Sequence, residues 1–256
     1  MQYEDIKNWE WSEYQSNKFL TSKILTSLKI KHGYFNRIFR NKKLEDIALA
    51  FDTDLEIHRT MQVHGDKVIM ASDHKSRINA DGLINTKKNQ ILCIYSADCI
   101  PVLIADKFNG RVCACHAGWK GIAKRLIPKA IEKMKSVDSN PMNLIIAMGP
   151  AVSAKNYPVR EDVTYAIFQS VCNQKNLNNN QDHLTQLKNM GIVDLSSTTD
   201  LFKIDIRLAL KYQLINEGIN ENQITICPLC TYDNPYIFFS RRREQGKGLQ
   251  WSCIVS

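Results

Sequence analysis

Three of the histidines and cysteines in the sequence lie within short segments rich in small and polar residues and could bind a metal: His64, Cys99 and His116. The segments read Gln-Val-His-Gly, Ser-Ala-Asp-Cys-Ile-Pro and Cys-His-Ala-Gly-Trp-Lys-Gly. Two imidazoles and one thiolate form a ligand set that suits zinc, and three protein ligands leave a fourth position open for water or substrate. An open position would make the site catalytic rather than structural.

The surroundings of Cys99 and His116 strengthen this prediction, because a lone cysteine or histidine is more often an ordinary core or surface residue. His116 precedes two glycines that allow backbone N–H groups to approach an anion where a helix is expected to begin. Asp98 would orient the site or accept a proton, or else cap the turn into Pro101. The other histidines are expected to be core or surface residues: His32, His58, His74 and His183.

Hydrophobic periodicity predicts the elements that must position these residues. Strands are expected at residues 90–99, 102–106, 111–117, 143–148 and 223–227. Helices are expected at 122–134, where Pro128 should kink or delay the helix, at 161–172, and at 205–217 with Gly218 as its C-cap. Residues 173–199 are expected to form a polar surface insertion. The predicted class is α/β, with residues 1–256 forming a single layered domain of mixed β-sheets and flanking helices.

The Asn109-Gly110 pair predicts a hairpin between the second and third of these strands. A two- or four-residue loop would place His116 opposite residue 103 or 101. Cys99 would then lie two to four positions further along, roughly 7–14 Å away at about 3.4 Å per residue. An irregularity at Pro101 is expected to close this gap, because proline interrupts strand pairing. The position of His64 does not follow from local pairing.

Composition limits the class of protein. The formal net charge of +8 comes from scattered Lys and Arg residues, which favours phosphate-bearing small molecules over nucleic acid as partners. The sequence shows no secretory or membrane-spanning segment, so a cytoplasmic protein with eight reduced cysteines is expected. Cys227 and Cys230 are expected to be structural thiols. A nucleobase-deaminase site is disfavoured, because Gly118 stands where its catalytic glutamate would be needed.

The chain resembles the laccase-domain proteins, also called the YfiH family and known as multicopper polyphenol oxidases. The matching segments extend over nearly the whole chain: Gln62–Gly65, Ala80–Leu83, Ser96–Pro101, His116–Gly121, Gly149–Pro150, Tyr157–Val159, Cys230–Tyr232 and Phe239–Arg243. The resemblance implies the YfiH-like fold and one metal and catalytic site made by His64, Cys99 and His116, with Asp98 beside it. It implies a zinc-dependent purine nucleoside phosphorylase that also deaminates adenosine, with copper as an alternative metal.

The resemblance also implies how substrates are bound. Gly118, Lys120 and Gly121 are expected to contact phosphate. Arg242 and Arg243 match paired arginines of the family and would bind an anion or form a structural ion pair. The chain departs from the family pattern in having Arg241 in place of an aromatic residue and Gly248-Leu249 in place of Gly-Arg. Asp81 is expected to hold its loop together.

Other functions remain open from the sequence. Multicopper oxidation of phenols needs many histidines, whereas this chain has six and lacks paired His-x-His elements. A hydrolase that edits peptidoglycan precursors would use the same site without phosphate, and an interaction module would show no turnover. The expected partners are a purine nucleoside and phosphate, without nucleic acid or membrane, in a monomer or homodimer.

Overall fold

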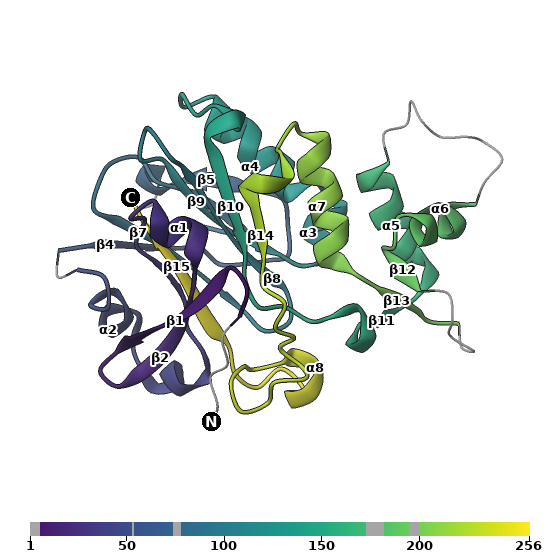
Figure 1. The fold of residues 1–256 in the computed structure, drawn as a ribbon, viewed down its shortest axis with the longest axis horizontal. Coiled ribbons are helices and arrows are strands. Elements are labelled where there is room, and N and C mark those ends of the chain that lie inside the picture. Colours follow the sequence, from purple (N-terminus) through teal and green to yellow (C-terminus); the bar gives the residue numbers. More distant parts are fainter. Residues whose placement is uncertain (1–5, 53, 74–77, 173–181, 195–199) are drawn as a thin grey trace.

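The computed structural model describes residues 6–52, 54–73, 78–172, 182–194 and 200–256. Two six-stranded sheets dominate this part of the chain (Figure 1). The first sheet has the order β1 (Trp9–Tyr14), β2 (Asn17–Ser22), β3 (His32–Tyr34), β15 (Gln250–Val255), β7 (Gln90–Ser96) and β4 (Glu56–Arg59). The second has the order β14 (Ile224–Ile226), β10 (Leu144–Met148), β8 (Ile100–Asp106), β9 (Val112–Ala117), β6 (Gly82–Ile84) and β5 (Val68–Met70). Both sheets mix parallel and antiparallel pairs.

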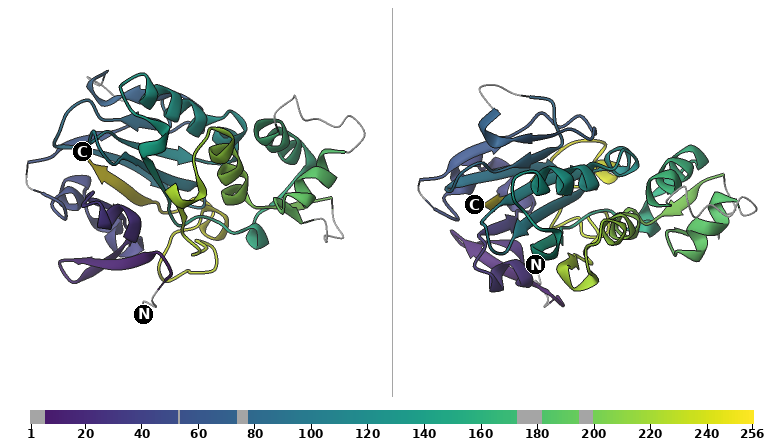
Figure 2. Two further views of the ribbon diagram at one scale, coloured as in Figure 1. Left: turned by 45° about the horizontal axis from the view of Figure 1, so that its top comes forward. Right: turned by 90° about the horizontal axis from the view of Figure 1, so that it is seen from above.

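The helices flank these sheets, as Figures 1 and 2 show. They are α1 (Lys23–Ser27), α2 (Leu44–Ala48), α3 (Trp119–Ala123), α4 (Leu126–Lys135), α5 (Glu161–Val171), α6 (His183–Asn189), α7 (Ile206–Asn216) and α8 (Arg241–Glu244). A small third sheet, β11 (Pro158–Val159), β13 (Phe202–Ile204) and β12 (Val193–Asp194), lies beside α5 and α6. The expected α/β class with mixed sheets and flanking helices is confirmed. No helix in the described ranges is both long and apolar enough to cross a membrane.

Strand alternation explains why the two sheets stack. On β8, Val102 and Ile104 belong to the core shared with α3, α4, α5 and α7. Leu103 and Ala105 point the other way, into a second core with Leu92 of the first sheet. Every residue of β8 and β9 is buried, as expected for strands covered on both faces. Packing on both faces therefore holds β9, which carries His116, and β8, which begins directly after Cys99.

The predicted hairpin is confirmed with the four-residue loop, and His116 pairs with Pro101. The predicted irregularity at Pro101 is wrong, because Pro101 lies within β8. Its carbonyl accepts a hydrogen bond from Gly149 N at 2.8 Å, so its backbone polar atoms face the β10 side and not His116. The missing N–H therefore removes no β8–β9 hydrogen bond.

Two other boundaries differ from the predictions. The strand expected at 90–99 ends at Ser96, and residues 97–99 form a turn in which Asp98 has φ +84°. Residues 173–199 are not simply a polar insertion, since α6 and β12 lie within them and Leu187, Ile192 and Val193 are buried. The prediction followed the polar composition of this segment and gave too little weight to its apolar residues, which have the spacing of a helix. Residues 173–181 and 195–199 of this prediction lie outside the described residues.

Of the helix predictions, those at 161–172 and 205–217 are confirmed, whereas the residues at 122–134 belong to two helices and the break does not lie at Pro128. The segment expected at 122–134 is divided at Arg125, which has φ +61°, and Pro128 lies in the first turn of α4, where its missing N–H needs no partner. The helix α5 ends at Val171, next to the expected boundary. The side chain of Asp205 caps α7, and Gly218 follows it with φ +82°.

The buried His32 makes stability depend on pH. Its Nε2 accepts a hydrogen bond from Ser22 N at 2.7 Å, and burial lowers its pKa to about 4. Because the unfolded chain has the higher pKa, the stabilisation is complete above about pH 6.5 and is lost as the pH falls toward 4. Between pH 7.5 and 5, urea titrations should show that wild type loses about 2 kcal/mol more unfolding free energy than His32→Gln. Equal losses in both proteins would contradict this.

Candidate active site

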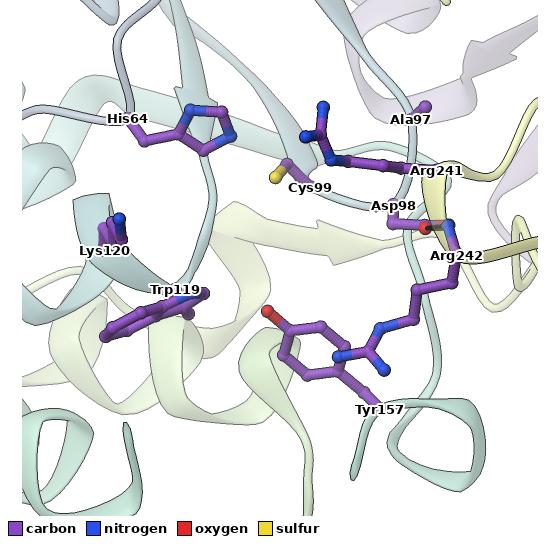
Figure 3. A pocket seen from close by; sticks show the side chains of 9 residues that line it. All are labelled: His64, Ala97, Asp98, Cys99, Trp119, Lys120, Tyr157, Arg241 and Arg242. Atoms are coloured by element: carbon purple, nitrogen blue, oxygen red, sulfur yellow. Dashed lines mark hydrogen bonds between the residues drawn. The ribbon is translucent and has the colours of Figure 1, made fainter. Parts of the chain in front are cut away.

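The structure brings His64, Cys99 and His116 together from three separate segments. His64 lies in the loop between β4 and β5, Cys99 in the turn between β7 and β8, and His116 on β9. Their ligand atoms all lie within 4.8 Å of one another, and the two imidazole ring centroids are 4.8 Å apart. Figure 3 shows His64 and Cys99 on the wall of one cavity. Within the described ranges, this is the group of His, Cys and acidic residues that has the spacing of a metal site.

One buried carboxylate positions both histidines. Asp81 Oδ1 accepts hydrogen bonds from His116 Nδ1 at 2.9 Å and from the backbone N–H of His64 at 3.0 Å. Its Oδ2 accepts from Val63 N and Gly65 N. His64 has φ +56°, and these three backbone bonds hold its loop in that less common conformation. Asp81 thus holds the loop of His64 rather than only its own.

The hydrogen bond to Asp81 also determines which nitrogen of His116 faces Cys99. With Nδ1 donating to Asp81, Nε2 remains to interact with the thiol. Burial alone would lower the pKa of His116, but its bonds with Asp81 and Cys99 raise that pKa to about 9. Burial would raise the pKa of Cys99, but hydrogen bonds from His116 and His64 lower it to about 7. The thiolate, which is the form that binds metals, is therefore stabilised at neutral pH.

The three residues fit a tetrahedral metal ion. Ligand atoms around zinc lie about 3.3–3.6 Å apart, so the ligand atoms of these three residues would have to approach one another by about 1 Å to bind it. Space for this cluster depends on Gly118, because a Cβ there would lie 2.8 Å from Cys99 Sγ and 3.2 Å from His64 Cδ2. A Cys/His₂ donor set accepts zinc and also copper(II).

We expect Gly118→Ala to weaken zinc binding by about 10- to 100-fold. Gly118 has φ −79°, so alanine introduces no backbone strain and the effect comes from contact with Cys99 Sγ. Competition with a chromophoric chelator measures the affinity. Gly110→Asn is the matched control. Gly110 lies in the turn of the β8–β9 hairpin, at the end remote from His116, with open space around it and a φ of +72° that asparagine tolerates. Zinc affinity of Gly118→Ala equal to that of wild type would contradict the expected contact.

A cavity of about 540 Å³ opens beside the cluster, which is a usual size for a small-molecule site. It combines aromatic and cationic side chains with two of the candidate ligands (Figure 3). Its lining residues are His64, Ala97, Asp98, Cys99, Trp119, Lys120, Tyr157, Arg241 and Arg242. Asp98 is the acidic residue of this lining, against three cations, so the cavity favours a ligand that carries negative charge.

Asp98 faces the C-terminal segment. Its Oδ1 accepts from Thr231 Oγ1 at 2.6 Å, and its Oδ2 accepts from Ser240 Oγ at 3.0 Å and from Arg242 N at 2.9 Å. These bonds hold the start of α8 against the turn that contains Cys99. These three bonds favour a positioning role for Asp98 over proton transfer. They do not support the alternative in which Asp98 caps the turn into Pro101, because all three donors belong to the C-terminal segment. The catalytic role expected for Asp98 stays a prediction.

The five residues expected to bind substrate or phosphate separate into two groups. Lys120 and Arg242 line the cavity, and Gly118 lies against the cluster. Gly121 instead packs closely on the His64 loop, since a Cβ there would lie 3.2 Å from Gly65 O. Arg243 donates to three backbone carbonyls and contacts Glu244, which favours the structural alternative for this residue.

Four cavity residues were not among the predicted site residues: Ala97, Trp119, Tyr157 and Arg241. Tyr157 points its hydroxyl into the cavity (Figure 3), and burial, together with the neighbouring Cys99, raises its pKa to about 12. It is therefore neutral at physiological pH and able to donate a hydrogen bond. The Arg242 guanidinium lies 4.3 Å from the centre of its ring. Arg241 lines the same cavity, and its only signal in the sequence was its position beside the paired arginines.

All eight cysteines are free thiols. Cys227 is fully buried, and Cys230 Sγ accepts hydrogen bonds from Ser153 and Asn156. Neither lines the cavity, in agreement with a structural role for this pair.

Comparisons with known proteins show which family the chain belongs to. Residues 36–256 match the family described as multi-copper polyphenol oxidoreductase laccase. A purine nucleoside phosphorylase of Synechocystis is 32% identical over 259 residues, which cover 97% of each chain. The purine nucleoside phosphorylase YlmD of Bacillus subtilis is 28% identical over 80% of this chain and 73% of its own.

Solved structures show the same fold. YlmD from Geobacillus stearothermophilus superposes with a TM-score of 0.79 at 19% identity, covering 96% of this chain and 98% of its own. The YfiH protein of Bacillus licheniformis superposes with a TM-score of 0.77 at 22% identity, covering 93% and 96%. The extent of the sequence match and the shared fold lead to one conclusion: the chain belongs to the multi-copper polyphenol oxidoreductase laccase family, also called the YfiH family.

Proposed function

We propose that this protein is a zinc-dependent purine nucleoside phosphorylase. It would convert adenosine, inosine or methylthioadenosine and phosphate into the free base and ribose 1-phosphate, with deamination of adenosine as a second activity. The observation that carries the proposal is a single His64/Cys99/His116 cluster opening on a cavity that is both aromatic and cationic. The names of the relatives support the same reaction.

The residues around the cavity have separate tasks in this proposal. Zinc held by the three ligands would polarise a substrate oxygen or lower the pKa of bound water. Trp119 and Tyr157 offer aromatic surfaces and one hydroxyl donor to a purine nucleoside. Lys120 and Arg242 supply a positive field that attracts the anionic reactant into the cavity. Asp81 keeps a proton on His116 Nδ1, so that Nε2 remains available as a ligand.

Copper is the alternative metal. The family description names copper, and the Cys/His₂ donor set accepts copper as well as zinc. Oxidation of phenols by a multicopper centre requires several clusters of histidines. This chain has six histidines, and its described residues bring two of them into one group of metal-site spacing. Copper in the same single site would therefore not by itself supply that chemistry.

The proposal is tested by incubating zinc-loaded protein with adenosine or inosine, with and without phosphate, and separating the products by chromatography. Free base and ribose 1-phosphate should form from either nucleoside only when phosphate is present. Inosine should form from adenosine without phosphate. The absence of all these products would refute the proposal, and oxygen consumption by copper-loaded protein with a phenol would support the alternative.

A further inference from the structure

Arg241 lies where two cavities meet. A second cavity of about 250 Å³ shares His64, Ala97, Cys99 and Arg241 with the larger one. The smaller cavity also reaches His116 and Ser96. Two adjoining cavities give two reactants separate places beside the metal cluster. Arg241 is the lysine or arginine that lines both of these cavities.

Among the residues that the structure describes, none is a hydrogen-bonding or ion-pair partner of the Arg241 guanidinium, which distinguishes it from its two neighbours. Arg243 is occupied by three backbone carbonyls and Glu244, and Arg242 donates to Pro158 O at 3.2 Å while lying over a tyrosine ring. For Arg241, the described part of the chain provides neither a hydrogen-bonding acceptor nor an ion-pair partner for the side chain. A planar guanidinium with all its donors available is the group best suited to bidentate binding of phosphate.

The backbone beneath this side chain is held firmly. Asp98 accepts hydrogen bonds from Ser240 Oγ and Arg242 N, on either side of Arg241. Arg241 O accepts from Gly246 N at 3.1 Å. Figure 3 shows the guanidinium extending beside Cys99. The buried carboxylate of Asp98 thus positions the cation beside the cluster, although no acceptor in the described ranges neutralises it.

A second observation points to a ligand in the smaller cavity. Ser96 lines this cavity and is 2% exposed, and its Oγ has no hydrogen-bond partner among the described residues. Buried hydroxyls without a partner are uncommon, because leaving one unsatisfied costs free energy. An oxyanion in the smaller cavity would provide the missing acceptor close to Arg241.

We propose that Arg241 binds the phosphate reactant where the two cavities meet, on the side of Ser96, while the nucleoside occupies the larger cavity. This inference rests on the proposed function. A phosphate oxygen would form the bond to ribose C1′ as the bond from C1′ to the purine nitrogen breaks. The electron pair of the broken bond goes to the base, which takes up a proton, and ribose 1-phosphate remains. Arg241 holds the attacking anion, and Trp119 contacts the nucleoside.

Steady-state kinetics of zinc-loaded Arg241→Met test the proposal. The KM for phosphate should rise by about 10- to 100-fold, whereas the KM for inosine at saturating phosphate should change by less than about 3-fold. Arg241→Lys should recover part of the loss. Trp119→Ala should show the opposite pattern, with the larger change in the KM for inosine. Lys247→Met, an exposed charge in the same segment, is the matched control and should behave as wild type.

Binding of inorganic phosphate, measured by calorimetry without nucleoside, separates this inference from the proposed function. Weaker phosphate binding by Arg241→Met and by Ser96→Ala supports the site even if wild type shows no phosphorolysis. Equal phosphate affinity in wild type and Arg241→Met would overturn it, as would the absence of phosphate binding in wild type. A rise in the KM for inosine alone would place Arg241 at the nucleoside and also overturn it.

Discussion

Cys99→Ala is expected to lower zinc affinity by roughly 100- to 1000-fold, which is about one ligand's share of a protein zinc site. Two imidazoles would remain, and Asp81 would still bind the imidazole of His116 and the backbone N–H of His64. The lost thiolate is the negatively charged ligand of the set, and its pKa of about 7 makes it available at neutral pH. Nucleoside turnover should fall below detection. Metal content after dialysis against a weak chelator, together with product formation, measures both effects.

Cys172→Ala is the matched control for this variant. Cys172 is a partly buried free thiol at the end of α5, outside both cavities. It should bind zinc and turn over nucleoside as wild type does. Full activity and a full complement of zinc in Cys99→Ala would exclude the metal site proposed here.

Asp81→Asn should have the second largest effect, because it changes a fully buried group that accepts four hydrogen bonds. An amide has one acceptor atom, so its NH₂ group would face N–H donors of the His64 loop or of His116. We expect a loss of about 3–5 kcal/mol in unfolding free energy and about 10- to 100-fold weaker zinc binding. In metal-free protein, loss of the carboxylate should also lower the pKa of His116 from about 9.

Imidazole NMR titration measures that pKa and distinguishes positioning from a general loss of stability. Asp106→Asn is the matched control: Asp106 is also buried and accepts backbone hydrogen bonds, but at the other end of β8. It should destabilise the fold without changing zinc affinity or the pKa of His116. An unchanged His116 pKa in Asp81→Asn would contradict the role assigned to this carboxylate.

Local sequence patterns predicted the hairpin well. The Asn109-Gly110 turn and the alternation of β8 and β9 determine the register, and this places His116 opposite Pro101. The Asp205 cap and Gly218 likewise mark the ends of α7 through interactions within a few residues. The segment at 173–199 was predicted less well. Leu187 and Ile192 are buried in a core that they share with α5 and α7, and a pattern within the segment does not reveal these tertiary contacts.

The sequence by itself determined the chemical types of the three candidate ligands, the register that brings Cys99 near His116, and the glycine that leaves space beside them. Only the tertiary structure decided where His64 lies, because Asp81 reaches it through side-chain hydrogen bonds across 17 residues of chain. The tertiary structure likewise separated Arg241, whose guanidinium has no partner in the described part of the chain, from Arg243, which is bound to carbonyls. Three adjacent arginines are chemically identical in a sequence, and only the acceptors around each one in the fold distinguish them.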